Sequence, residues 1–314
     1  MNLIFNTFFS FIDHSDIRWK QFATTIAGGN GRGNRLDQLH FPNGISLDDQ
    51  SQLIYVADFN NHRVLEWGLK TNKGRIVAGG NGKGNRLDQL NEPTDVIIDR
   101  QNNHLIIADG GNRRVMRWAR HSNSPPQIII SDMDCSRLAM HGDGTLYVSD
   151  WKKNEIIRWK RGETQGIVVA GGNGRGNQLN QLSSPSFLFI DNDHTLYISD
   201  FGNHRVMKWL ENTKEGIVVA GGNGKGDRLT QLSSPLGVTV DHFDRIYVAD
   251  CDNNRIMQWY EGKKEGTVVV GGNGQGQEKN QLSCPGGLSF DKEGNLYVAD
   301  RWNDRIEKFE RKLD

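Results

Sequence analysis

The sequence lacks the features that mark several common classes of protein. No apolar run approaches the roughly 18 residues of a membrane span, so we expect no membrane partner. Seven prolines, and glycines without a three-residue period, exclude a collagen-like chain. The 38 basic residues balance the 38 acidic ones, so bulk charge does not direct the protein to nucleic acid.

Cysteine is also scarce. Cys135, Cys251 and Cys284 contain no C-x-x-C pair, so the sequence shows neither zinc-ligand spacing nor a disulfide framework. We expect all three to be small buried hydrophobic residues. The apolar N-terminus MNLIFNTFFSFI lacks the basic start and the small-residue cleavage site of a signal peptide. These absences favour a cytoplasmic location, with secretion as the alternative.

Glycine, in contrast, is abundant and is concentrated in one repeated segment. AGGNGRGNRLDQL begins at Ala27, and related copies begin at Ala78, Ala170, Ala220 and Val270, each with a proline 14 residues after its first glycine. In the second copy Lys83 is followed by Gly84, whereas a phosphate-binding loop of the Walker type needs Ser or Thr there. Five copies at nearly constant spacing indicate architecture rather than a nucleotide site.

A second motif, D-x-x-N-x-R, is centred on aspartates at 58, 109, 150, 200, 250 and 300. Around it each unit reads as four short strands, such as GVTV, IYVAD, RIMQW and TVVV, which are separated by polar turns. Six such units predict an all-β fold, a six-bladed β-propeller of four-stranded antiparallel blades. We assign it to residues 20–314 and expect residues 1–19 to be a poorly ordered extension.

The last unit has only three strands. Residues 22–27 precede the first GGNG segment, in the place where other units have their fourth strand. We therefore predict that this N-terminal strand joins the last blade and closes the ring, which removes the exposed sheet edges.

Aspartate, then asparagine three residues later and arginine five residues later, after a strand that begins with Pro-Gly, resembles the NHL repeat. The resemblance covers about residues 20–310 and implies a platform for binding protein or RNA. It does not imply ubiquitin ligation, because no RING, B-box or coiled-coil segment is present. The zinc-dependent amidating lyases that share the repeat use a set of histidines that does not converge in this register.

The repeated residues are better explained by structure than by chemistry. A Trp or Phe recurs in every third strand, at 67, 118, 159, 209, 259 and 309, and we expect it to pack between blades. The Asp and Arg of each D-x-x-N-x-R motif bracket one loop, so we expect charge-assisted hydrogen bonds that fix the loop. We therefore predict no catalytic residues, no metal and no cofactor.

Two kinds of loop share one face of the predicted ring, those with GGNG and those with D-x-x-N-x-R. The GGNG loops carry eight basic residues against four acidic ones, a net charge of +4. Such a surface is typical of binding to phosphate or to an acidic partner, although a solvated mixed-charge surface is the alternative. The predicted basic rim contains Arg32, Arg35, Lys83, Arg86, Arg175, Lys225 and Arg228.

The third unit departs from the repeat, because it lacks the GGNG loop and has Glu155 where other units have arginine. We expect a notch there, between blades two and three. Two residues after each proline, near the channel mouth, three glycines leave space, and Asp95 and Arg137 are placed to pair. The predicted binding site comprises Asp95, Arg113, Arg137, Trp151, Lys152, Lys153 and Phe187; degeneration of the repeat is the competing explanation.

The sequence thus predicts a monomeric, non-enzymatic scaffold that binds a protein, a peptide or single-stranded RNA on this face. Trp151 would offer RNA a stacking surface. The alternative is a hydrolase or lyase of the six-bladed type with a metal in its channel. That chemistry needs several polar residues on the innermost strands, whereas only Asp95 and Arg137 are polar at the position two residues after the proline.

Overall fold

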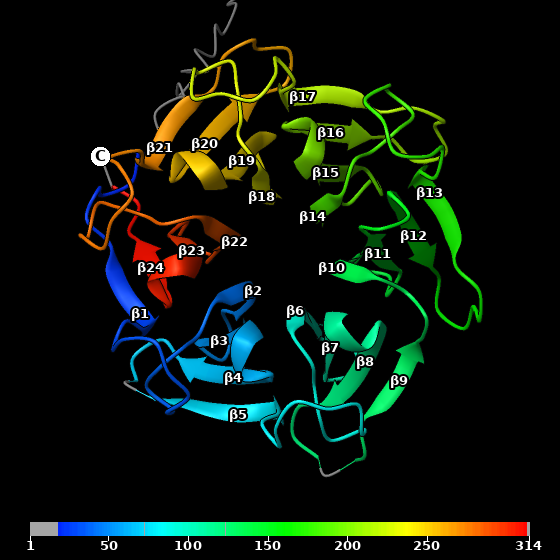
Figure 1. Cartoon of the computed structure of the whole chain (residues 1–314), viewed down its shortest axis with the longest axis vertical. Coiled ribbons are helices and arrows are strands. Elements are labelled where there is room, and N and C mark those ends of the chain that lie inside the picture. Colours follow the sequence, from blue (N-terminus) through cyan, green and yellow to red (C-terminus); the bar gives the residue numbers. More distant parts are fainter. Residues whose placement is uncertain (1–17, 72, 123, 313–314) are drawn as a thin grey trace, which may run out of the picture.

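The computed structural model describes residues 18–71, 73–122 and 124–312. Six four-stranded antiparallel sheets stand in a ring around a central channel (Figure 1), which confirms the predicted six-bladed β-propeller. In each blade the first strand is innermost and the fourth outermost. Among the described residues, no helix is long and apolar enough to cross a membrane.

The strands of each blade follow one another along the chain. Blade 1 has β2 Pro42–Asp48, β3 Leu53–Asp58, β4 Arg63–Gly68 and β5 Gly74–Gly79, and blade 2 has β6 Pro93–Asp99, β7 His104–Asp109, β8 Arg114–Ala119 and β9 Gln127–Ile130. Blade 3 has β10 Cys135–Met140, β11 Leu146–Asp150, β12 Glu155–Trp159 and β13 Ile167–Gly171, and blade 4 has β14 Pro185–Ile190, β15 Leu196–Asp200, β16 Arg205–Trp209 and β17 Ile217–Gly221. Blade 5 has β18 Pro235–Val240, β19 Arg245–Asp250, β20 Arg255–Tyr260 and β21 Thr267–Gly271, and blade 6 has β22 Pro285–Phe290, β23 Leu296–Asp300 and β24 Arg305–Phe309.

The repeated aromatic residues pack between blades, as predicted. Trp67 is 2% exposed and belongs to a cluster that joins blade 1 to Tyr297 and Ile306 of blade 6. Its ring also requires a glycine at the start of the fourth strand, because a Cβ atom on Gly74 would lie 2.6 Å from the indole. The same glycine recurs beside Trp159, Trp209 and Trp259. The apolar core is therefore a series of layers between adjacent blades.

The N-terminal strand β1, Thr24–Gly28, pairs antiparallel with β24, where Thr24 lies opposite Lys308 and Gly28 lies opposite Arg305. This confirms the predicted closure of the ring. Upstream, Trp19 is 3% exposed, bridges to Arg311 and donates its Nε1–H to Gly294 O at 3.0 Å. The assignment of residues 1–19 as an extension stays a prediction, since residues 1–17 lie outside the described chain.

The expectation for the cysteines is wrong in one respect: Cys251 and Cys284 form a disulfide. Cys251 follows the aspartate of blade 5, and Cys284 precedes the first proline of blade 6. The ring brings these two positions of neighbouring blades together, with the Cα atoms 4.1 Å apart. A separation of 33 residues gives no sign of this contact in the sequence. Cys135 is buried with a free thiol, as expected.

Candidate functional site

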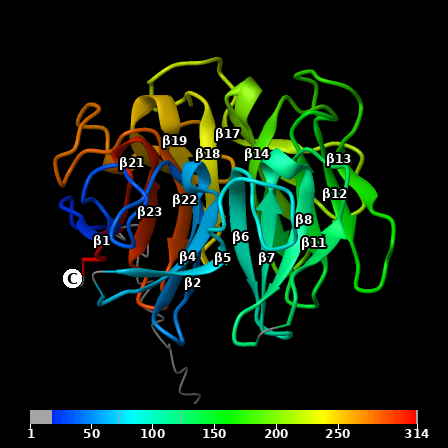
Figure 2. The same cartoon turned by 60° about the horizontal axis from the view of Figure 1, so that its bottom comes forward.

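The connections from each fourth strand to the next blade, and those from second to third strands, lie on one face, which we call the loop face (Figure 2). The opposite face carries the remaining connections, and we call it the turn face. Each GGNG loop is closed by its own side chains. Gln38 donates to Asn30 O at 3.0 Å, Asn30 donates to Asp37 O at 3.1 Å, and the other four loops repeat both bonds.

The Asp, Asn and Arg of the second motif fix these loops to the blades. Asp58 is fully buried, and its Oδ2 accepts hydrogen bonds from Asn61 at 2.8 Å and from Arg63 Nε at 2.7 Å. The Arg63 guanidinium also donates to the carbonyl oxygens of residues 34, 35 and 38 in the GGNG loop. Blades 2, 4, 5 and 6 repeat the carboxylate–arginine pair. The predicted Asp–Arg pair that fixes the D-x-x-N-x-R loop is therefore confirmed, and the contacts of its arginine with the GGNG loop are an addition to that prediction.

Most of the predicted basic rim is neutralised within the protein. Ion pairs join Arg32 to Asp304, Arg35 to Asp37, Lys83 to Glu92, Arg86 to Asp88 and Lys225 to Asp252. Arg175 donates to the Ser183 hydroxyl at 3.0 Å, while Arg228 is exposed. Three of the acidic partners, Glu92, Asp252 and Asp304, lie outside the GGNG loops and were not counted in the sequence estimate of charge. The free positive charge of this face is accordingly smaller than the sequence suggests.

Blade 3 is irregular on the loop face, as the sequence indicates. The chain passes from β9 to β10 without a long loop (Figure 1). Asp150 Oδ1 accepts the amides of Lys152 and Lys153, and among the described residues its buried Oδ2 has no hydrogen-bond partner. Beside it, Trp151 is 49% exposed and donates its amide to Asp134 O.

The expected notch is not on the loop face, because Met133 is buried there and donates its amide to Arg113 O. Arg113 itself forms an ion pair with Asp134 at 3.1 Å. A hollow of about 360 Å³ does lie between blades 2 and 3, but it is lined by turn-face residues such as Gln101, Asn102 and Gly162.

Asp95, Arg137 and Phe187 meet at the loop-face mouth of the channel. The Arg137 guanidinium lies 3.7 Å from the centre of the Phe187 ring and donates to Thr94 O, Ser136 O and Asn43 Oδ1. It thereby spans from blade 3 to blade 1 on one side and to blade 4 on the other. Burial lowers the pKa of Arg137 to about 10, although the charge of Asp95 acts in the opposite direction.

Asp95 and Arg137 do not form a direct ion pair among the described contacts. The Asp95 carboxylate accepts the amides of Val96 at 2.9 Å and Leu138 at 3.0 Å. Burial raises its pKa to about 6, and Arg137 opposes that rise. The nearby glycines do not leave open space, which corrects our expectation. A Cβ atom on Gly44 would lie 1.9 Å from Asp95 Oδ1, so this glycine allows neighbouring inner strands to approach closely.

Sequence reasoning missed Arg301, which follows the aspartate of blade 6. Its guanidinium lies 4.4 Å from the centre of the Phe41 ring, and its Nη1 lies 3.6 Å from Cys284 Sγ. Burial lowers the pKa of Arg301 to about 9, and the charge of Arg137 lowers it further. The sequence did contain a sign of this site, because Arg301 is the one charged residue at the position directly after the motif aspartate. The other five residues at this position are Phe59, Gly110, Trp151, Phe201 and Cys251.

Below this mouth the channel forms a cavity of about 510 Å³. Side chains of the innermost strands line it, and they are mainly apolar, such as Ile45, Ile97, Leu138 and Val238. Asp95 and Phe187 lie at one end, and Asp291 and Lys292 from a turn between strands lie at the other. The predicted site residues thus fall into two groups, one inside the mouth (Asp95, Arg137, Phe187) and one around it (Arg113, Trp151, Lys152, Lys153).

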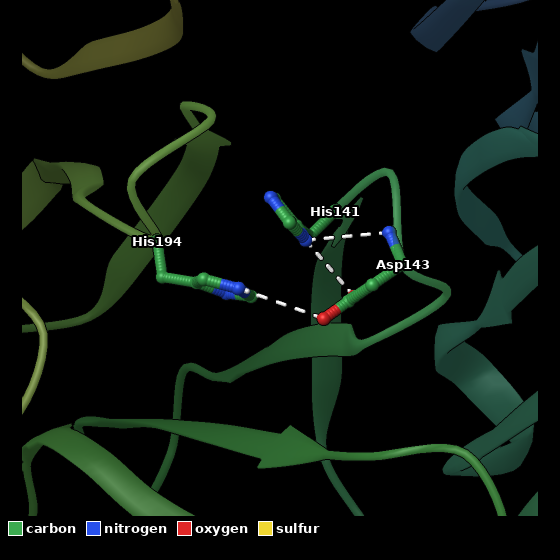
Figure 3. Close-up of side chains that lie close together, drawn as sticks. All are labelled: His141, Asp143 and His194. Carbon is green, nitrogen blue, oxygen red and sulfur yellow. Dashed lines mark hydrogen bonds and ion pairs between the residues drawn. The ribbon is translucent and has the colours of Figure 1, made fainter.

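The turn face carries a cluster that the sequence did not predict (Figure 3). His141, Asp143 and His194 each offer one ligand atom, and these atoms lie within 4.8 Å of one another. His141 and Asp143 belong to the turn before β11, and His194 belongs to the turn before β15. The sequence did not indicate this cluster, because the two histidines are 53 residues apart and do not match a known metal-ligand spacing. His141 and His194 also occupy different positions of the repeat, so the repeat does not align them.

Comparison with known proteins supports the propeller. The NHL repeat family matches residues 39–67 and 282–309. A comparison with curated protein sequences finds no match.

Several solved structures have the same fold. An auxiliary nutrient binding protein from Bacteroides thetaiotaomicron VPI-5482 has a TM-score of 0.72 at 15% identity, covering 95% of this chain and 78% of that one. A gluconolactonase from Xanthomonas campestris has a TM-score of 0.62 at 12% identity, covering 95% and 98%. A streptogramin B lyase has a TM-score of 0.58 at 10% identity, covering 95% and 99%. At such identities the likeness concerns the fold alone.

Proposed function

Because the chain is a six-bladed β-propeller of the NHL-repeat family, we propose that it is a non-enzymatic binding protein whose loop face holds an acidic segment of a partner protein. One observation carries this proposal. Arg137 is buried and Arg301 is partly buried at the channel mouth, and neither forms an ion pair with a carboxylate among the described contacts. Unpaired buried charge is unfavourable, and a ligand carboxylate would relieve it.

The chemistry of the two arginines suits a carboxylate. Arg137 Nε and Arg301 Nε are buried, and neither has a hydrogen-bond partner among the described residues. Each guanidinium is also held by an aromatic ring, Phe187 for Arg137 and Phe41 for Arg301. Guanidinium groups held in a fixed orientation bind carboxylates well, because the planar fork matches the two oxygens. Trp151, exposed beside the mouth, adds an aromatic contact for the rest of the segment.

A protein segment is favoured over single-stranded RNA by the charges of the rim. RNA binding relies on several free cations along the path of the strand. Here five of the seven predicted rim residues are already in ion pairs. Arg137 and Arg301, which have no ion pair with a carboxylate among the described residues, lie together at the mouth, and two such arginines suit one or two carboxylates better than a chain of phosphates.

Selection of peptides on tag-free protein tests the proposal. Twelve-residue peptides selected from a random library should be enriched in Asp and Glu, and fluorescence anisotropy should show at least about tenfold weaker binding to Arg301→Gln, since truncating one partner of a buried charge pair costs about 2–5 kcal/mol. Arg228→Gln, an exposed arginine on the same face, is the matched control. Equal binding to both variants would contradict the proposal.

Two further measurements separate the alternatives. Trp151→Ala should weaken the selected peptides, whereas Trp302→Ala should not, although Trp302 is also 49% exposed on the loop face. An oligouridine probe tests the RNA alternative. Its binding, if present, should fall steeply between about 50 and 200 mM salt, by roughly 300-fold for six phosphate contacts to a single strand.

We also propose that the protein is not an enzyme and acts as a monomer. The mainly apolar innermost strands support the first point, because channel-metal hydrolases and lyases need several polar ligands there. The strand count supports the second, because all six blades have four strands from this one chain, β1 completing blade 6, so no blade requires a strand from a second copy.

The expected cytoplasmic location remains a prediction, and the Cys251–Cys284 disulfide bears on it. Reducing agents keep most cytosolic thiols reduced, whereas structural disulfides are typical of oxidising compartments. An intact disulfide in the cell would therefore contradict a cytoplasmic location.

A further inference from the structure

The cluster on the turn face brings together three groups that commonly ligate metals (Figure 3). His141 Nδ1 lies 2.9 Å from Asp143 Oδ1, and His194 Nε2 lies 3.5 Å from Asp143 Oδ2. Asp143 comes from blade 3, and the two imidazole rings, from blades 3 and 4, lie with their centres 3.7 Å apart. The cluster is half-exposed at Asp143 and more covered at the histidines.

The hydrogen bonds of His141 point to a positive charge inside this cluster. His141 Nε2 lies 3.2 Å from Asn192 O, and because a carbonyl only accepts, Nε2 must carry the proton in that contact. Nδ1 of the neutral ring then carries a lone pair, which the Asp143 amide approaches at 3.3 Å and which a bound metal would take in place of that amide. The same lone pair faces a carboxylate oxygen. Two acceptors in contact repel unless a cation lies between them, either a proton or a metal.

His194 is oriented in a compatible way. Its Nδ1 lies 2.8 Å from the Tyr147 hydroxyl, which can accept a hydrogen bond from Nδ1–H or donate one to an unprotonated Nδ1. When Nδ1 is the donor, Nε2 carries a lone pair directed at Asp143, which is the tautomer that a metal ligand requires. A hydrogen bond to the outer nitrogen of a histidine ligand is the usual means of fixing its tautomer and ring orientation at metal sites.

We propose that His141 Nδ1, Asp143 and His194 Nε2 bind a divalent transition metal of the zinc class, which clamps the turns of blades 3 and 4 together. Two imidazole nitrogens and one carboxylate suit Zn²⁺, whereas Ca²⁺ and Mg²⁺ prefer oxygen ligands. Ligand bonds of about 2.0–2.2 Å place neighbouring ligands of a tetrahedral ion roughly 3.3–3.6 Å apart. The two His–Asp distances are 2.9 and 3.5 Å, to the two oxygens of Asp143, and one ligand atom from each residue lies within 4.8 Å of the others. Three protein ligands leave a fourth position for water or an outside donor.

This site is separate from the loop-face mouth, because the connections between first and second strands lie on the other side of the ring. The proposed binding function therefore does not depend on the metal. Conversely, loss of peptide binding in an arginine variant would leave the metal site intact, so the two proposals can fail separately.

Zinc titration of tag-free, chelator-treated protein tests the proposal. Competition with a chromophoric chelator should show one high-affinity Zn²⁺ per chain. His194→Ala and Asp143→Asn should each weaken binding at least about tenfold. The matched control is His242→Ala, since His242 lies in the corresponding turn of blade 5 outside the cluster. Absence of stoichiometric zinc, or undiminished binding by His194→Ala, would overturn the proposal.

A second variant covers the case in which His194→Ala fails to fold. Tyr147→Phe keeps the ring but removes the hydroxyl beside His194, and loss of such a partner lowers metal affinity by about 10–100-fold. Bound Co²⁺ gives an independent readout, because its visible absorption reports the ligand geometry and should be lost in Asp143→Asn. A Tyr147→Phe protein that binds zinc and Co²⁺ as the wild type does would contradict the assigned role of His194.

Discussion

At the scale of single residues, Glu307 interrupts a regular apolar position. The corresponding residues of the other third strands are Leu65, Met116, Ile157, Met207 and Met257. Glu307 is 1% exposed and lies 2.9 Å from Arg305, which already binds Asp300. Its Oε2 is buried and has no hydrogen-bond partner among the described residues. Burial raises the pKa of Glu307 to about 7, and the charge of Arg305 opposes the rise.

This raised pKa predicts a pH dependence with a definite sign. Between about pH 4.5 and 7 the folded protein binds more protons at Glu307 than the unfolded chain does, so this residue makes stability fall as the pH rises. Glu307→Met should therefore raise the free energy of unfolding by about 1–3 kcal/mol at pH 8 and by less at pH 4.5. Urea unfolding at both pH values measures the difference.

Glu265→Gln, at an exposed position, controls for the loss of a negative charge in general. A Glu307→Met protein whose stability changes with pH as steeply as that of the wild type would refute this explanation.

At the scale of elements, the D-x-x-N-x-R turn and the GGNG loop act as one unit. The sequence predicted the Asp–Arg pair but not its contacts with the GGNG loop, although Asp, Asn and Arg recur at fixed spacing wherever that loop is present. Blade 3 has no GGNG loop before it and has also lost the asparagine and the arginine of the motif. Lys153 and Glu155 occupy those two positions. The correlated loss follows from the contacts, since each arginine binds three carbonyl groups of the loop before its own blade.

The buried arginine of this unit should therefore be costly to remove. Arg205 is 5% exposed, donates to Asp200 at 2.8 Å and also binds the carbonyl groups of residues 177, 178 and 181. Arg205→Ala leaves a buried carboxylate without its cation, which typically costs about 3–5 kcal/mol. Chemical denaturation should show this loss, while Arg228→Ala, at an exposed arginine, should change stability by about 0.5 kcal/mol or less.

Contacts between elements of different blades were much less predictable. Strands and turns follow from local alternation and from Gly, Asn and Asp, which act over a few residues. Arg137 and Asn43 are 94 residues apart, and His141 binds a carbonyl group 51 residues away. Such contacts depend on which rotamers the neighbouring blade permits, and no periodic pattern encodes them. The sequence therefore located the irregular blade but not Arg301, the disulfide or the histidine cluster.

At the scale of the whole molecule, the ring depends on one short strand. β1 completes blade 6, and Trp19 and Ala23 extend the contact into an apolar cluster shared with blade 5. The sequence predicted this closure because the last unit lacked a strand and the N-terminus had one to spare. The closure could be inferred because the repeat specifies how many blades there are and how many strands each blade needs, so that a missing strand is apparent from the sequence.

Removal of residues 1–28 should accordingly destabilise the entire ring rather than one blade. The deletion exposes the edge of β24 and uncovers the apolar surface below Trp19, so we expect a lower melting temperature and concentration-dependent aggregation. Circular permutation supplies the control: residues 18–28 joined through a flexible linker to the C-terminus should restore the wild-type melting temperature. An unchanged melting temperature in the deletion would refute the closure.

The pairing of β1 with β24 also fixes how the ring would respond to mechanical load. The described ends lie together, since Lys20 donates its amide to Glu310 O and Lys312 donates its amide to Arg18 O. Thr24 and Lys308 therefore stand at the end of the strand pair from which both chain segments leave. Tension between these segments would open the hydrogen bonds in succession rather than shear them together. The pairing of β1 with β24, which stabilises the whole ring against thermal unfolding, would therefore separate under a small mechanical force.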